Sequence, residues 1–200
     1  MRIAVLVSGS GSNLQSLLDA SATDPDFGVD IALVVSDRPG VGALDRATDA
    51  GVATEVVPWK GDRAAFTRAV CDTVADHGCE AMVLAGFMRI LGPEAVARFP
   101  ERILNIHPSL LPAFPGAHAV PQALAHGVKT SGVTVHFVDE EVDHGPIIAQ
   151  RSVPVHPDDD EASLHARIQE QEHVVYPQAV KAFARGELSV EGRVVRWSGV

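Results

Sequence analysis

The sequence predicts an α/β fold in which a mostly parallel central sheet has helices on both faces. In the first half, short apolar runs alternate with helical patterns, which is typical of βαβ units. The 200 residues are 46% hydrophobic and 21% charged, which is enough apolar material for a packed core. No internal repeat or linker-like stretch interrupts the chain. We therefore expect a single domain over residues 1–200.

Continuous apolar runs place the strands of the first half, and helical patterns lie between them. The runs that predict strands buried on both faces are residues 3–7, 31–35, 82–85 and 103–106. A further strand is expected at residues 53–57. The helical patterns cover residues 13–22, 42–50 and 62–77. The last of these ends at Gly78, a residue that commonly terminates helices.

The pattern changes after His107, where four turn-forming residues fall within ten positions. Regular structure cannot run through Pro108, Pro112, Pro115 and Gly116, so a shaped loop is expected. We then expect a short helix, a strand, an acidic loop and another strand at residues 120–126, 134–138, 139–145 and 147–153. The acidic run at residues 158–161 predicts the N-terminal cap of a long last helix.

Charge and composition exclude several classes of function. The formal net charge of −10 disfavours binding to a nucleic-acid backbone. No apolar run approaches the roughly 18 residues of a membrane span, and the start does not form a signal peptide, so a cytoplasmic protein with no membrane partner is expected. The only cysteines, Cys71 and Cys79, predict reduced core thiols. The histidines lack metal-binding spacing, so we predict no metal site.

A glycine-rich segment, residues 9–13, follows the first strand and opens the first helix. Glycine backbone and helix N-terminal N–H groups at such a point favour an anion such as phosphate. The segment departs from the dinucleotide-binding pattern because position 14 is Leu14 rather than glycine. It therefore predicts a phosphate-binding loop, with a plain tight turn as the alternative, and does not identify the ligand.

Asn105 and His107 lie at the end of a buried strand, two residues apart. Their side chains should project to the same side, at the carboxyl edge where open α/β sheets bind ligands. A polar Asn105 within an apolar strand requires hydrogen-bonding partners, so a purely structural asparagine is the alternative. Asp143, in the acidic loop after another strand, is a candidate partner that orients His107.

Four segments together resemble the phosphoribosylglycinamide formyltransferase family, within the folate-dependent formyltransferase superfamily. They are residues 9–15, 86–91, 105–112 and 143–148, in family order over nearly the whole chain. The resemblance implies a Rossmann-like formyltransferase domain. It also implies transfer of the formyl group of 10-formyltetrahydrofolate to the amine of phosphoribosylglycinamide, in de novo purine (IMP) biosynthesis. The folate would be a co-substrate and the partners small molecules, with no metal, in a monomer or a homodimer.

The resemblance also implies roles for individual residues. The catalytic residues would be Asn105, His107 and Asp143. Phosphoribosylglycinamide would be bound by Gly11, Ser12, Asn13, Glu172 and His118. The folate pocket would be lined by Arg63, Met88, Arg89, Ile90, Leu91, Asn105, Asp139, Glu140, Glu141, Val142 and Asp143. The family also suggests a cis bond between Leu111 and Pro112.

Formyl transfer gives each catalytic candidate a chemical role. It passes through a tetrahedral intermediate with a negatively charged oxygen, to which the Asn105 amide can donate. The attacking amine loses a proton and the leaving nitrogen gains one, a task suited to His107. Asp143 would support the charged form of His107. His144 is expected to be an exposed loop residue, with tuning of neighbouring groups as the alternative.

Two other functions remain as alternatives. A formyltetrahydrofolate deformylase would use Asn105, His107 and Asp143 with water as the acceptor, but that family carries an extra N-terminal regulatory domain. The tRNA and sugar formyltransferases carry a further C-terminal domain, so chain length disfavours them. A non-catalytic nucleotide-binding module would explain residues 9–13 but would leave the buried Asn105 unexplained.

Overall fold

The computed structural model describes residues 1–198, so residues 199–200 of the predicted domain lie outside it. The strands are β1 (Arg2–Val7), β2 (Asp30–Ser36), β3 (Ala53–Val56), β4 (Ala81–Leu84), β5 (Ile103–His107), β6 (Thr130–Phe137), β7 (Ile147–Pro154), β8 (Leu188–Glu191) and β9 (Val194–Trp197). The helices are α1 (Ser12–Thr23), α2 (Gly42–Asp49), α3 (Arg63–Asp76), α4 (Pro93–Arg98), α5 (Ala119–His126) and α6 (Glu161–Ala184).

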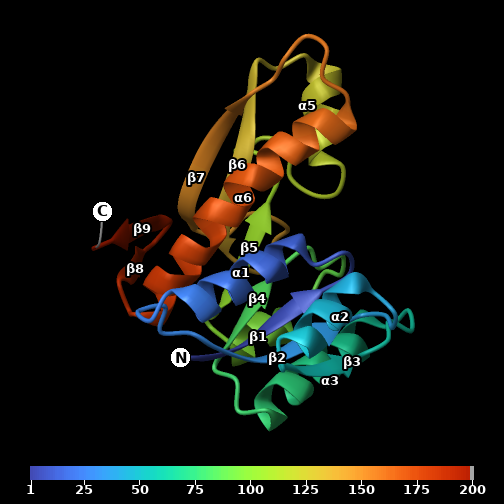
Figure 1. Cartoon of the computed structure of the whole chain (residues 1–200), viewed down its shortest axis with the longest axis vertical. Helices are drawn as coiled ribbons and strands as arrows, with labels where there is room; N and C mark the ends of the chain where they lie inside the picture. Colours follow the sequence, from blue (N-terminus) through green and yellow to red (C-terminus); the bar gives the residue numbers. More distant parts are fainter. Residues whose placement is uncertain (199–200) are drawn as a thin grey trace.

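The strands form one sheet, in the order β3-β2-β1-β4-β5-β6-β7-β9-β8 (Figure 1). Neighbours from β3 to β5 pair in parallel, whereas β6 runs antiparallel to both β5 and β7. The predicted mostly parallel α/β sheet is confirmed. The chain leaves β1 towards β2 and later returns to place β4 on the other side of β1, so a topological switch point lies between β1 and β4.

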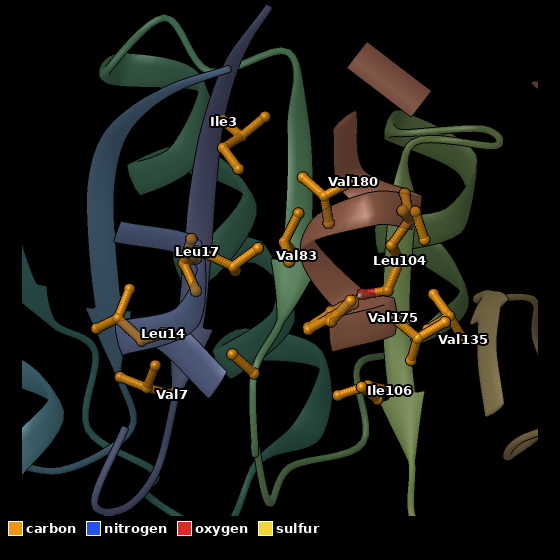
Figure 2. Close-up of a cluster of buried hydrophobic side chains, with 14 of the residues drawn as sticks. Ile3, Val7, Leu14, Leu17, Val83, Leu104, Ile106, Val135, Val175 and Val180 are labelled. Carbon is orange, nitrogen blue, oxygen red and sulfur yellow. Dashed lines mark hydrogen bonds between the residues drawn. The ribbon is translucent and has the colours of Figure 1, made fainter. Parts of the chain in front are cut away.

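Helices cover both faces of the sheet, as predicted. On one face, α1, α2 and α6 pack against the sheet, and Figure 2 shows Leu14 of α1 near Val7 and Val175 of α6 near Ile106. On the other face, α3 and α4 enclose a second core that holds both cysteines. Burial raises the pKa of the Cys71 thiol to about 11, which keeps it protonated and unreactive.

Local sequence signals explain where the helices begin. Asp62 precedes α3 and accepts a hydrogen bond from the Ala65 backbone at 3.0 Å. Asp160 precedes α6 and accepts from the Ser163 backbone at 2.8 Å, while the Ser163 hydroxyl accepts from the Asp160 backbone. The acidic run is therefore a helix cap, as predicted. None of the helices in residues 1–198 is long and apolar enough to cross a membrane.

Three parts of the prediction differ from the structure. The short helix α4 was not expected, although Pro93 at its start is typical of a first helical turn. Strand β6 begins at Thr130, four residues before the predicted start, because Gly132 packs tightly against the backbone of Arg151 on β7. The β8–β9 hairpin was missed because each strand is only four residues long.

Candidate active site

The glycine-rich loop connects β1 to α1 at the switch point. Gly11 caps α1 with φ 78°, and a Cβ there would lie 2.7 Å from Ala43 on α2. The loop is also held by backbone contacts, since the Ala43 N–H donates to the Gly9 carbonyl at 3.1 Å. Arg46 on α2 donates through Nε to the Ser10 carbonyl at 2.9 Å. Glycine is thus required at position 11, both because of the positive φ and because α2 approaches closely.

Asn13 links this loop to α6 through a buried contact. Its Nδ2 donates to Oε2 of Glu172 at 2.8 Å, and both side chains are buried. Its Oδ1 is also buried and has no hydrogen-bond partner within the described residues. Burial raises the pKa of Glu172, and the Asn13 hydrogen bond opposes that shift only in part. The unsatisfied amide oxygen and the raised carboxylate pKa are both typical of a binding site for a polar ligand.

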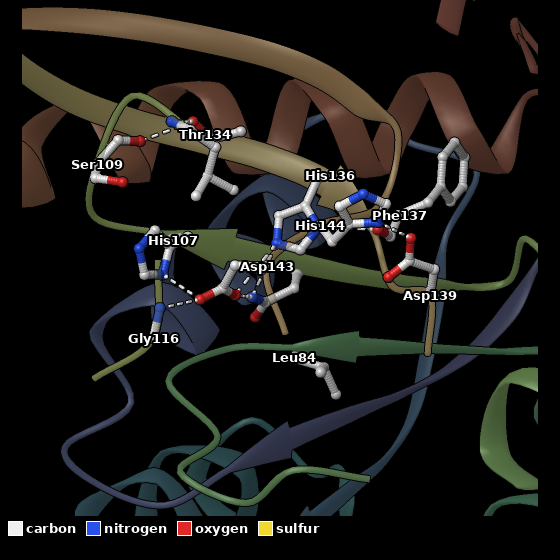
Figure 3. A network of polar contacts seen from close by, with 12 residues as sticks. Leu84, His107, Ser109, Gly116, Thr134, His136, Phe137, Asp139, Asp143 and His144 are labelled. Carbon is white, nitrogen blue, oxygen red and sulfur yellow. Dashed lines mark hydrogen bonds and ion pairs between the residues drawn. The ribbon is translucent and has the colours of Figure 1, made fainter. Parts of the chain in front are cut away.

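The structure brings Asn105, His107 and Asp143 together at the carboxyl end of β5. Oδ2 of Asp143 lies 3.3 Å from Nδ1 of His107, and its Oδ1 lies 3.4 Å from Nδ2 of Asn105. Figure 3 shows the His107 ring and the Gly116 backbone on the same side of Asp143, and the Gly116 N–H donates to Oδ2 at 2.7 Å. The alternation of side chains along β5 that the sequence predicts therefore places both residues beside the same carboxylate.

The proline-rich loop after β5 closes over His107. The Nε2 of His107 lies 2.8 Å from the carbonyl oxygen of Phe114, so a proton on Nε2 is donated to that oxygen. Phe114 and His118 have positive φ angles of 53° and 69°, and the Leu111–Pro112 bond is cis, as the family suggests. His107 itself is only 6% exposed. Both ring nitrogens consequently face oxygen atoms of the protein.

His136 on β6 belongs to the same polar cluster, although the sequence analysis gave it no role. It pairs with Asn105 across the β5–β6 ladder, and its Nε2 lies 3.1 Å from the Asn105 amide nitrogen. Its Nδ1 lies 2.8 Å from the Phe137 carbonyl, so a proton on Nδ1 leaves Nε2 as the acceptor for Asn105. A lone histidine in the apolar run 133–137 was the available signal.

Asp143 is ionised by its surroundings despite being largely buried. Burial alone would raise its pKa, but the charge of His107 and the Gly116 N–H lower it, and the pKa lies below the ordinary aspartate value. Asp143 also has a positive φ of 53°, a left-handed conformation that aspartate adopts more readily than most other residues with a side chain. The cluster therefore contains a fixed negative charge beside an imidazole and an amide donor.

The segment after β4 presents apolar side chains next to this cluster. Leu84 pairs with Asn105 in the β4–β5 ladder, so residues 86–91 leave the sheet beside the polar cluster. Met88 and Ile90 are 67% and 54% exposed, and Val142 in the acidic loop is 48% exposed. Large exposed apolar side chains around a polar centre are typical of a small-molecule site. The surface fits a ligand with an extended apolar part.

Polar contacts anchor that segment on the parallel half of the sheet. Arg89 donates through Nε to Asp37 at 2.6 Å, and its guanidinium lies 5.3 Å from the centre of the Trp59 ring. The Met88 N–H donates to the Ser8 hydroxyl at 2.9 Å. Burial alone would raise the pKa of Asp37, but Ser8 and Arg89 lower it below its ordinary value. Asp37, at the end of β2, was not predicted as a site residue.

The remaining predicted site residues lie around this centre in different ways. Arg63, at the start of α3, donates to the Leu91 carbonyl at 2.6 Å. Asp139 contacts His144 at 2.7 Å, while Glu140 and Glu141 are at or near the surface. Ser12 begins α1, and His118 precedes α5 without a side-chain hydrogen bond to its first turn. Within residues 1–198, no group of three or more acidic, histidine or cysteine side chains is arranged to hold a metal ion.

Comparison with known proteins places this geometry in a family context. Residues 1–180 match the family described as Formyl transferase. Phosphoribosylglycinamide formyltransferase of Escherichia coli (strain K12) is 43% identical over 192 residues, which cover 95% of this chain and 90% of that protein. The trifunctional purine biosynthetic protein adenosine-3 of Drosophila melanogaster is 45% identical over 96% of this chain, but this chain spans only 14% of that protein's length.

Solved structures agree with these matches. Glycinamide ribonucleotide transformylase 1 from Symbiobacterium toebii is 47% identical with a TM-score of 0.95, over 98% of this chain and 93% of that one. A formyltetrahydrofolate deformylase from Pseudomonas syringae shares the fold, with a TM-score of 0.91. It is 29% identical, over 98% of this chain and 65% of that one. Sequence identity is thus lower to the hydrolase than to the transferases.

Proposed function

Since the chain belongs to the formyl transferase family and has phosphoribosylglycinamide formyltransferase activity in de novo purine biosynthesis, we propose that Asn105, His107 and Asp143 perform the transfer. The donor is 10-formyltetrahydrofolate and the acceptor is the glycinamide amine. The bond between the amine nitrogen and the formyl carbon forms, and the bond to the folate nitrogen breaks. The observation that carries the proposal is the contact of Asp143 with both His107 and Asn105, at 3.3 and 3.4 Å.

Asn105 is the proposed donor to the oxygen that becomes negatively charged as the amine attacks. Its amide nitrogen is oriented by two acceptors, Nε2 of His136 at 3.1 Å and Oδ1 of Asp143 at 3.4 Å. The contact with Asp143 is the longer, so the hydrogen directed there is the one that a substrate oxygen can share. His136 accepts the other hydrogen and keeps the amide plane in place.

His107 is the proposed group that moves the proton. It accepts the proton that the amine loses and supplies the one that the folate nitrogen gains, which suits an imidazole at neutral pH. Asp143 at Nδ1 stabilises the positive charge that the ring then carries. On the other side of the ring, the bond from Nε2 to the Phe114 carbonyl must be exchanged for one to a substrate.

The two substrates are proposed to occupy opposite sides of this cluster. The residues proposed for the ribonucleotide are Gly11, Ser12 and Asn13 at the phosphate, Glu172 at the ribose hydroxyls and His118 nearby. Those proposed for the folate are Arg63, Met88, Arg89, Ile90 and Leu91, together with Asp139, Glu140, Glu141, Val142 and Asp143 from the acidic loop. The exposed apolar groups of Met88, Ile90 and Val142 support this assignment.

The test follows product formation from 10-formyltetrahydrofolate with and without phosphoribosylglycinamide. We expect strict dependence on the amine, and folate turnover without it would instead indicate a deformylase. His107→Ala should lower kcat by about 10²- to 10⁴-fold, the usual contribution of a general acid or base. The matched control is His156→Ala at an exposed position, which should keep the parent activity. Normal turnover of His107→Ala would remove that residue from the mechanism.

The proposal also covers the location, the partners and the domain organisation of the enzyme. We propose a cytoplasmic location and small molecules as the partners, with no membrane bound. The net charge of −10 also argues against binding to nucleic acid. We also propose one formyltransferase domain over residues 1–200, because a single sheet runs through the chain. Every proposed site residue lies on one chain, so a monomer and a homodimer would both contain complete sites.

A further inference from the structure

Arg193, in the turn between β8 and β9, reaches the loop that carries Asp143. Its Nη2 donates to the backbone carbonyl of His144 at 2.6 Å, and its Nη1 lies 3.0 Å from Nε2 of the His144 ring. The two residues are 49 positions apart in the chain. The C-terminal hairpin therefore touches the acidic loop directly, and none of the roles proposed above involves this contact.

The His144 ring extends this contact across the loop. Its Nδ1 lies 2.7 Å from Oδ2 of Asp139, at the start of the loop. Nη1 of Arg193 lies 3.3 Å from Nδ1 and 3.0 Å from Nε2 of this ring, so the guanidinium packs over the face of the imidazole. Asp139, His144 and Arg193 thus form a continuous chain of contacts from the base of the loop to the hairpin. This gives the exposed His144 a specific partner on each side.

The segment held by these contacts immediately follows Asp143. Asp143 has a left-handed backbone conformation, with φ 53°, which is uncommon outside glycine although aspartate adopts it more readily than most residues. Gly145 lies so close to the backbone of Phe137 that a Cβ would collide with its carbonyl oxygen. The His144 peptide between them is held by Arg193. Without that contact, the loop has one fewer restraint on the constrained residue.

We propose that Arg193 is a positioning residue, through which the C-terminal hairpin holds residues 139–145 so that Asp143 points at Asn105 and His107. The proposal rests on the proposed function, because it takes Asp143 as part of the active site and residues 139–143 as part of the folate site. Loss of Arg193 should therefore affect folate binding and turnover. Binding of phosphoribosylglycinamide, proposed at α1 and α6, should be unaffected.

The first test compares Arg193→Ala with Arg196→Ala in the full chain. Arg196 lies on the same hairpin but pairs with Glu191, at 3.1 Å. Losing a hydrogen bond from a charged donor should raise the KM for 10-formyltetrahydrofolate and lower kcat, each by about five- to tenfold. The KM for phosphoribosylglycinamide should stay within about twofold of the parent value, and Arg196→Ala should match the parent in all three constants. Arg193→Lys should recover only part of the loss, because an ammonium lacks the fork that contacts ring and carbonyl together.

The second test does not depend on turnover. Hydrogen–deuterium exchange of residues 139–145 should be faster in Arg193→Ala than in the parent and unchanged in Arg196→Ala. Equal exchange in both variants would overturn the proposal, and so would a lower unfolding midpoint in Arg193→Ala with parent-like kinetic constants. If the parent chain does not formylate phosphoribosylglycinamide, the proposed function fails, while the exchange result still decides whether Arg193 holds the loop.

Discussion

The parallel and antiparallel halves of the sheet support the site in different ways. On the parallel side, backbone groups hold much of the loops, as where the Ser8 N–H donates to the Gly86 carbonyl at 3.2 Å, and the buried Asp37–Arg89 pair adds a side-chain contact. On the antiparallel side, side chains hold one another, as where Asp143 contacts both His107 and Asn105. A loop held by backbone groups keeps its shape when an exposed side chain is replaced. It loses that shape when a larger residue is placed where the backbone is closely packed. A cluster of side chains is sensitive to each charge and donor that it contains.

This difference predicts which kinetic constant each half controls. Variants of Asn105, His107 and Asp143 on the antiparallel side should lose turnover, because these side chains provide the proposed proton transfer and oxyanion contact. Variants of the parallel-side loops should lose binding or stability, because these loops shape part of the proposed substrate sites. A rise in KM alone from one of those three residues, or a loss of kcat alone from a parallel-side loop, would break the comparison.

The largest effect is expected from Asp143→Asn, which removes the fixed negative charge but keeps the shape of the side chain. We expect kcat to fall by about 10²- to 10⁴-fold, as for loss of a group that supports general acid–base catalysis. Because the surroundings lower the pKa of Asp143, its charge persists at neutral pH and is lost only as the pH falls through that lowered value. The exposed Asp158→Asn serves as control, and an equal loss there would contradict the prediction.

Asn105→Ala should cause the next largest loss of kcat, because it removes the proposed donor to the developing oxyanion. Loss of one such donor commonly lowers kcat by about 10²- to 10³-fold. Asn105→Asp keeps the size of the side chain but replaces the donor with an acceptor, so it should be at least as impaired. Single-turnover rates at saturating substrates would measure the effect. A rise in KM with unchanged kcat would contradict this prediction and would indicate that Asn105 contributes to substrate binding instead of to turnover.

On the parallel side, Gly11→Ala should lower the free energy of unfolding by about 1–3 kcal/mol, because it combines an unfavourable φ with a collision against Ala43. The KM for phosphoribosylglycinamide should rise as the loop is displaced. Gly9→Ala is the matched control for stability, since a Cβ at Gly9 would meet no atom within 4 Å. Denaturant unfolding measures both variants, and equal stabilities would show that the loop has room for a Cβ.

A smaller change in binding is expected from Asp37→Asn, which weakens the contact that holds Arg89. The pair is joined at 2.6 Å with the Asp37 side chain fully buried. Losing its charge should raise the KM for 10-formyltetrahydrofolate by about two- to fivefold, while kcat changes little. Asp30→Asn, which weakens an exposed pair with Arg2 at the amino ends of β1 and β2, should leave both constants unchanged. A loss of kcat alone in Asp37→Asn would contradict this assignment.

The smallest effect should appear as a change in how stability depends on pH. Burial raises the pKa of Glu172 in the folded protein, so folding favours its protonated form. The parent therefore loses this stability as the pH rises from the ordinary value of 4.5 through the raised folded value. Glu172→Gln cannot ionise, so its stability relative to the parent should improve with increasing pH. Urea unfolding at pH 4, 6 and 8 tests this, and a constant difference would refute it.

Most of the sheet could be predicted because its strands carry their own signal. Runs such as residues 3–7 and 82–85 are continuously apolar, which is typical of a strand buried on both faces when turn residues follow at that length. The elements that were missed lack such a signal. The start of β6 contains Thr130 and Gly132, and its pairing with β7 depends on contacts that local sequence does not encode. The β8–β9 hairpin is short and only partly buried.

The candidate site was predictable where it depends on local geometry. Asn105 and His107 share one strand, and its two-residue period puts them on one side. His136 and Asp37 could not be placed in the same way, because their roles depend on which strands become neighbours. The antiparallel register of β6 sets His136 opposite Asn105, and the position of β2 beside β1 brings Asp37 to Ser8 and Arg89. Such contacts follow from topology rather than from spacing along the chain.

The contact between Asn13 and Glu172 joins residues that are 159 positions apart. During synthesis, the phosphate loop leaves the ribosome early, but its partner on α6 emerges only when most of the chain has been made. A nascent chain that ends before α6 therefore lacks one wall of the proposed nucleotide site. It also leaves part of one face of the sheet uncovered, because Leu164, Ile168 and Val175 have not yet been made. Substrate binding and completion of this core thus both depend on the synthesis of α6.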